Sequence, residues 1–254
     1  SLKEALTFVF FIKGCNQKER YTWNMTLNTT LPEGFVYLNA IDPSIQTSLR
    51  YFGNHNFIGE PIEGYTSNHV IMTEAAAKAL SKAQSMFKTD NYSIVVYDSY
   101  RPQTAVNHFV RWSQDVHDNK MKASYYPRVN TADVFDLGYI SKKSGHSRGS
   151  TIDLTLIHKN SILTEIKFQS RILNTGVEIS FLEDGTIDMG SSFDLFDEAS
   201  HFQNDLITSE HLSRRNYLKE VMEVCGFKAY AKEWWHFTLK DEPFPDTYFD
   251  FPVR

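Results

Sequence analysis

The stretch from Ser144 to Leu156, SGHSRGSTIDLTL, starts as a polar turn and becomes apolar directly after Asp153. Its second half is rich in β-branched residues, which predicts a strand over residues 150–157. His146 lies in the turn and Asp153 in the strand. Gly149 between them allows the backbone to fold back, so both side chains can reach one centre. Taken alone, however, the pair also fits an ordinary solvated turn that leads into a strand.

A second polar pair lies in EWWH, residues 233–236. Glu233 and His236 belong to a predicted strand that is otherwise aromatic and apolar. A carboxylate and an imidazole are costly to bury there unless each has a partner. A zinc ion would be the partner of the imidazole, and a water bound to that ion would be the partner of the carboxylate. The alternative is a Glu–His salt bridge at a sheet edge, with the tryptophans in the core.

Together the two stretches predict a catalytic zinc site. His146, Asp153 and His236 supply two imidazoles and one carboxylate, which leaves the fourth position of a tetrahedral zinc ion for water. Glu233 would not bind the metal but would take a proton from that water, whose pKa the ion lowers. A purely structural zinc site is disfavoured, because such sites usually have four protein ligands, often cysteines.

The rest of the chain predicts an α+β fold, because helices and hairpins occur in blocks without regular βαβ alternation. Helices are expected over residues 73–87, 102–117 and 209–225, and further strands over 92–98 and 233–239. We expect a single domain with a mostly antiparallel central sheet that carries the zinc site, and with flanking helices.

Several boundaries follow from capping and turn residues. Thr73 and Ser209 are the expected N-terminal caps of their helices, and Pro102 is the expected first residue of the helix between them. Gly226 is expected to end the last helix. Residues 158–188 predict strands joined by polar turns, including a hairpin with Asp184-Gly185 at its tip.

Composition restricts the possible partners. The chain has 254 residues and a formal net charge of −5, which argues against nucleic acid as the main partner. No apolar run is long enough for an integral membrane span. Residues 1–30 are either the remnant of a lipoprotein signal ending near Gly14-Cys15 or an additional strand. The compartment stays open, with the cell envelope slightly favoured over the cytoplasm, and the sequence does not indicate an oligomeric state.

The two stretches carry a specific resemblance. Ser144-x-His146-x-x-Gly149-x-x-x-Asp153 followed by Glu233-x-x-His236 resembles the two-part signature of the zinc D,D-peptidases. Within that group the chain is similar to the D-alanyl-D-alanine dipeptidases of the VanX type. The similarity continues, in the same order, in LRYFGNHNFIGEPIEGY (49–65), YDSYRP (97–102), MGSSFDLFDEASH (189–201) and the block 213–237.

The resemblance implies a role for eight residues. One Zn²⁺ per chain would be held by His146, Asp153 and His236. Glu233 would be the general base and then the proton donor to the leaving amine, and Arg101 would stabilise the oxyanion. Asp194 would receive the free ammonium group of the D-Ala-D-Ala substrate, and Ser144 and Tyr51 would be pocket contacts.

Two points stay open on the sequence alone. The stretch between Asp153 and Met189 is longer than the family pattern, so the catalytic domain of residues 31–254 should contain an inserted hairpin or loop within 157–188. The chain could also be a D,D-carboxypeptidase or another peptidoglycan-stem peptidase of the same fold, or a non-catalytic module that binds wall peptides. Glu233 and Arg101 argue against the last alternative, because a binding module needs neither a base nor an oxyanion donor.

Overall fold

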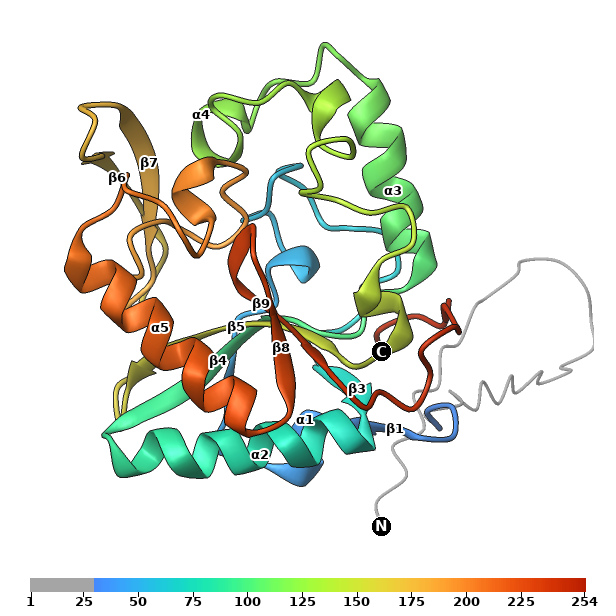
Figure 1. Cartoon of the computed structure of the whole chain (residues 1–254). Coiled ribbons are helices and arrows are strands. Elements are labelled where there is room, and N and C mark those ends of the chain that lie inside the picture. The colour runs from blue at the N-terminus through green and yellow to red at the C-terminus, as the bar shows by residue number, and fades with distance from the viewer. Residues whose placement is uncertain (1–29) are drawn as a thin grey trace, which may run out of the picture. The chain divides into compact units, whose positions relative to one another are not determined.

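The computed structural model describes residues 30–254, in which nine strands and five α-helices occur (Figure 1). The helices are α1 (Leu38–Ile41), α2 (Glu74–Thr89), α3 (Gln103–Gln114), α4 (Lys122–Tyr125) and α5 (Ser209–Val224). The strands are β1 (Phe35–Tyr37), β2 (Gln46–Thr47), β3 (Ile71–Thr73), β4 (Tyr92–Asp98), β5 (Thr151–His158), β6 (Lys167–Ile172), β7 (Glu178–Glu183), β8 (Phe227–Tyr230) and β9 (Glu233–Leu239).

A five-stranded sheet in the order β2-β4-β5-β9-β8 lies at the centre. The pair β2–β4 is parallel, and the pairs β4–β5, β5–β9 and β8–β9 are antiparallel. Helix α2 packs on β4, α5 packs on β8 and β9, and the two helices contact each other (Figure 1). The predicted mixed fold with a mostly antiparallel central sheet is therefore confirmed. Strand β5 is buried over seven of its eight residues, from Thr151 to Ile157, which explains its apolar composition.

Local sequence signals located most boundaries to within a few residues. Thr73 caps α2, and its hydroxyl accepts a hydrogen bond from the backbone N–H of Ala76. Pro102 is the cap residue of α3 rather than its first residue, and that helix ends at Gln114. The cap of α5 is Thr208 rather than the expected Ser209, because it is the Thr208 hydroxyl that accepts from the backbone N–H of His211.

The hairpin prediction was wrong in its position. Strands β6 and β7 pair with each other, and the turn between them lies at residues 173–177. Gly176 there has a φ of +81°, which suits glycine, and the N–H of Leu173 bonds the carbonyl of Val177 at 2.8 Å. Asp184 follows β7 and is buried, and its carboxylate accepts hydrogen bonds from Arg50 and Tyr97. It is thus an interior ionic contact and not a solvated turn tip.

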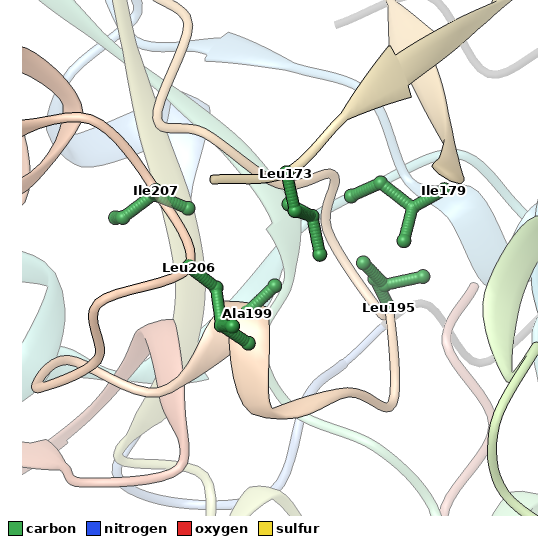
Figure 2. Close-up of a cluster of buried hydrophobic side chains, with 6 residues drawn as sticks. All are labelled: Leu173, Ile179, Leu195, Ala199, Leu206 and Ile207. Atoms are coloured by element: carbon green, nitrogen blue, oxygen red, sulfur yellow. The ribbon is translucent and has the colours of Figure 1, made fainter. Parts of the chain in front are cut away.

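The β6–β7 hairpin stands apart from the central sheet but is anchored by a small hydrophobic cluster (Figures 1 and 2). Leu173 and Ile179 come from the hairpin, and the other buried members come from the segment before α5. These other members are Leu195, Ala199, Leu206 and Ile207. The cluster therefore connects the hairpin to residues that directly follow Asp194.

The segment between Met189 and His201 is also held by a buried arginine of α5. The guanidinium of Arg215 in α5 donates to the carbonyls of Met189, Ala199 and His201 at 2.7–2.9 Å, and to the hydroxyl of Ser191 at 3.1 Å. Burial lowers the pKa of Arg215 to about 9, with Asp188 opposing this change. One side chain thus satisfies four acceptors of a stretch whose regular structure is limited to one short 3₁₀ helix, Glu198–Ser200.

We expect Arg215→Ala to lower the free energy of unfolding by roughly 3 kcal/mol or more, because several buried acceptors lose their partner. Urea denaturation measures this change. The matched control is Arg214→Ala, since that neighbouring side chain is 34% exposed, pairs with Glu210 on the surface and donates to one backbone carbonyl, that of Asp188. Its expected cost is within about 1 kcal/mol. Equal losses in both variants would contradict the structural role of Arg215.

Within residues 30–254, none of the helices is both long and apolar enough to cross a lipid bilayer. The two interpretations of the N-terminal segment concern residues that lie outside those described.

Candidate metal centre and active site

Two adjacent strands of the central sheet place the first pair of predicted ligands side by side. Asp153 on β5 is directly paired with His236 on β9, and on its other side it pairs with Asp98 at the end of β4. The distance from Asp153 Oδ1 to His236 Nδ1 is 3.1 Å. Sheet register alone therefore explains why two residues far apart in the sequence meet here.

The third predicted ligand arrives from the turn before β5. His146 lies in a short 3₁₀ turn, Gly145–Arg148. The N-cap of this turn is Ser144, whose hydroxyl accepts a hydrogen bond from the backbone N–H of His146. Gly149 ends this turn with a φ of +86°, and a side chain there would collide with the ring of Phe35. The turn thus folds back as predicted, and His146 Nε2 lies 3.2 Å from Asp153 Oδ2.

The donor set fits a metal ion. One ligand atom each from His146, Asp153 and His236 lie within 4.8 Å of one another. His146 Nδ1 donates to the carbonyl of Ser99 at 2.7 Å, which leaves Nε2 unprotonated toward the cluster. Asp153 Oδ1 is buried, yet nothing among residues 30–254 gives it a well-formed hydrogen bond, although His236 Nδ1 is near. Two imidazoles and a carboxylate are donors that zinc accepts.

The buried charges around His146, Asp153 and His236 also favour a bound cation. Burial opposes protonation of His236, but the facing carboxylates Asp153 and Glu233 outweigh it and raise its pKa to about 9. Burial would raise the pKa of Asp153, but the two imidazoles reverse this and lower it. Glu233 is buried and lies 3.3 Å from His236 Nδ1; its burial raises its pKa, with His236 opposing. Two buried carboxylates, Asp153 and Glu233, thus face the single imidazole of His236, an arrangement that a bound metal cation would also stabilise.

Arg101 lies beside the three candidate metal ligands. It is held by a residue that the sequence analysis did not single out. Asp98 Oδ2 accepts from Arg101 Nε at 2.9 Å, and its Oδ1 accepts from the hydroxyl of Tyr65 at 2.6 Å. The guanidinium reaches to 3.6 Å from Asp153 Oδ2. An aspartate three positions before Arg101, at the end of the strand expected over residues 92–98, was the available sequence signal for Asp98.

Asp194 occupies the same pocket in an unusual backbone conformation. Its φ is +61°, in the left-handed region that residues other than glycine seldom adopt. Its carboxylate is buried and accepts a hydrogen bond from the hydroxyl of Tyr51 at 2.6 Å. Burial, reinforced by the charge of Asp153, raises the pKa of Asp194 well above its ordinary value. A cationic group bound beside Asp194 would favour its ionised form and offset the cost of burying that charge.

These side chains line one cavity of about 230 Å³. All eight predicted residues line it, namely Tyr51, Arg101, Ser144, His146, Asp153, Asp194, Glu233 and His236. Its other walls include the aromatic rings of Phe57, Phe109, Tyr139 and Phe196. Pockets for drug-sized ligands measure roughly 300–1,000 Å³, so this one suits a small, polar molecule.

The site and the sheet that carries it are typical of a metal-dependent hydrolase: three side chains that could hold a metal ion, a buried glutamate and an arginine surround one small cavity. Comparison with known proteins gives a narrower class. A family model described as D-ala-D-ala dipeptidase matches residues 32–166 and 173–254. The chain therefore belongs to this family of metallopeptidases, which are hydrolases.

Individual relatives agree with the family match. The chain is 39% identical over 219 residues to a D-alanyl-D-alanine dipeptidase of Streptomyces coelicolor, covering 86% of this chain and 98% of the relative. It is 38% identical over 221 residues to that of Enterococcus faecium, covering 87% and 98%. It is 39% identical over 223 residues to that of Enterococcus faecalis, covering 88% and 100%.

Proposed function

We propose that this chain binds one Zn²⁺ through His146, Asp153 and His236 and hydrolyses D-Ala-D-Ala to two molecules of D-alanine. The substrate follows from the names of the relatives and from the size of the cavity. The observation that carries the proposal is the buried carboxylate of Asp194 in the cavity that also contains the metal cluster. It offers a counter-charge to a free amino terminus close to the site of cleavage.

The chemistry divides between the ion and the side chains. When bound, zinc would lower the pKa of the attacking water and polarise the scissile carbonyl. Glu233 accepts the proton of that water as the C–O bond forms, and it returns the proton to the leaving nitrogen as the C–N bond breaks. Glu233 is buried and lines the cavity, so its carboxylate can reach a substrate held there for both transfers.

Arg101 is suited to the developing oxyanion. Its guanidinium lies over the rings of Tyr51 and Phe109, 5.0 and 5.2 Å from their centroids, and Asp98 fixes its orientation. A preorganised cation needs no rearrangement when negative charge forms on the carbonyl oxygen. Ser144 would contact the substrate at the pocket edge. Tyr51 would act through its hydrogen bond to Asp194.

The deciding experiment is an assay of zinc-loaded protein with two substrates. Release of D-alanine from D-Ala-D-Ala, with much slower cleavage of N-acetyl-D-Ala-D-Ala, is expected, because an amide leaves the buried Asp194 without a cation. Equal cleavage of both would replace the dipeptidase by a D,D-carboxypeptidase. Binding of either peptide without cleavage would indicate a wall-peptide binding module.

Asp194→Asn tests the ammonium contact directly. We expect KM for D-Ala-D-Ala to rise by about tenfold or more, since a charge-assisted hydrogen bond is lost. Cleavage of N-acetyl-D-Ala-D-Ala should not fall in parallel. Asp205→Asn is the matched control, because Asp205 is exposed and outside the cavity. A proportional loss of cleavage rate on both substrates would show that Asp194 does not bind the amino terminus of the substrate.

We also propose that the β6–β7 hairpin is the insertion expected within 157–188 of the catalytic domain, residues 31–254. The family match supports this, because the six residues that it leaves out, 167–172, are those of strand β6.

A further inference from the structure

The left-handed backbone of Asp194 raises the question of what holds it. Such a conformation persists only where the surrounding structure determines it. The carboxylate itself has a single protein partner among residues 30–254, the hydroxyl of Tyr51. The restraint must therefore act on the residues next to Asp194 and next to Tyr51.

The residues on both sides of Asp194 are attached to the β6–β7 hairpin. Before it, the hydroxyl of Ser192 accepts a hydrogen bond from the backbone N–H of Leu182 in β7 at 2.6 Å. After it, the fully buried Leu195 packs in the cluster that contains Ile179 of β7 (Figure 2). The hairpin thus fixes the chain two residues before and one residue after the strained position.

Asp184, the first residue after β7, provides a second restraint. Its Oδ2 accepts from Arg50 Nη2 at 2.6 Å and from the hydroxyl of Tyr97 at 2.7 Å. Arg50 directly precedes Tyr51. The ring of Tyr97 stacks on Phe193, which directly precedes Asp194, with centroids 4.8 Å apart. One buried carboxylate therefore bonds the residue before Tyr51 directly, and through the ring of Tyr97 it reaches the residue before Asp194.

We propose that the β6–β7 hairpin and Asp184 form a positioning element that sets the Tyr51–Asp194 pair and thereby the selectivity for a free amino terminus. The inference rests on the proposed function, because Asp194 matters to selectivity only if it binds the substrate ammonium. It assigns a task to a hairpin that lies partly outside the family match. The hairpin itself contributes no residue to the lining of the cavity.

Two variants test the element from different sides. Asp184→Asn removes the charge that pairs with Arg50, and Ile179→Ala removes packing against the Leu195 cluster but keeps the ion pair. For both we expect KM for D-Ala-D-Ala to rise by about tenfold, because the charge-assisted contact depends on placement. Turnover of N-acetyl-D-Ala-D-Ala per folded enzyme should stay unchanged. The matched control, Ile207→Ala, lies in the same cluster but on neither the hairpin nor the flanks of Asp194.

The readout separates positioning from simple destabilisation. Loss of folded protein lowers apparent kcat but leaves KM unchanged, so Ile207→Ala should keep the wild-type KM. Unchanged KM in both folded, zinc-loaded variants would overturn the proposal. If the wild-type protein releases no D-alanine from D-Ala-D-Ala, the proposed function itself fails. If it does so, and the variants retain its KM and its preference for the free dipeptide, only the positioning element fails.

Discussion

Glu233→Gln is expected to lower kcat for D-Ala-D-Ala by about 10²–10⁴-fold, the usual contribution of a general acid–base group. The amide matches the carboxylate in shape but cannot accept a proton. Glu233 is buried beside His236 at the start of β9 and lines the cavity, where it is the proposed proton acceptor. The measurement is the initial rate of D-alanine release at saturating substrate, together with zinc content by atomic absorption.

Zinc content decides how this result is interpreted. Bound zinc should stay at about one per chain, because the three proposed ligands are intact. Glu223→Gln, an exposed position on α5, is the matched control and should retain wild-type turnover. Near-wild-type turnover in Glu233→Gln would remove Glu233 as the base, whereas loss of zinc would make it a ligand.

Asp153→Ala is expected to abolish both zinc binding and activity. Asp153 lies between the two histidines, 3.2 Å from His146 Nε2 and 3.1 Å from His236 Nδ1, so its loss leaves two imidazoles without the carboxylate that completes the set. Three protein ligands are the usual minimum of a catalytic zinc site. Zinc content and D-alanine release should therefore fall together.

Metal removal from the wild-type protein should reproduce this loss reversibly. A chelator is expected to stop D-alanine release and to lower the Tm, because a ligand that binds only the folded state stabilises it. Added Zn²⁺ should restore both in the wild type but not in Asp153→Ala. His158→Ala, at the exposed end of the same strand, should behave like the wild type. Full activity after complete removal of metal would refute the zinc mechanism.

Local patterns were sufficient for much of the fold. Helix α2 and strands β4, β5 and β9 could be predicted because capping threonine, β-branched runs and apolar spacing act within a few residues. The hairpin tip could not be placed, because Asn174-Thr175-Gly176 and Asp184-Gly185 are both good turn sequences. Arg50, 134 residues earlier, pairs with Asp184 and withdraws it from solvent.

In the candidate site, too, some features could be predicted from the sequence and others depend on contacts between distant residues. Histidines, carboxylates and their spacing indicated which residues could bind a metal. Asp98 was missed as a site residue, because its importance lies in its burial and in the hydrogen bond from Tyr65, 33 residues earlier, which together fix the carboxylate that holds Arg101. The buried role of Arg215, next to a surface arginine, was equally invisible, since a helical pattern does not reveal which neighbour meets four carbonyl and hydroxyl acceptors.

The mixed fold, the family and the kinds of side chain available for chemistry can all be predicted from the amino-acid sequence, because they follow from short-range patterns and from motifs. Three relations depend on tertiary contacts: the pairing of Asp153 with His236, the left-handed backbone of Asp194, and the packing of the β6–β7 hairpin against the residue that follows Asp194. Sheet register and buried contacts between distant segments set those relations. Their energies depend on which groups lose water together, and no local stretch of the chain contains that information.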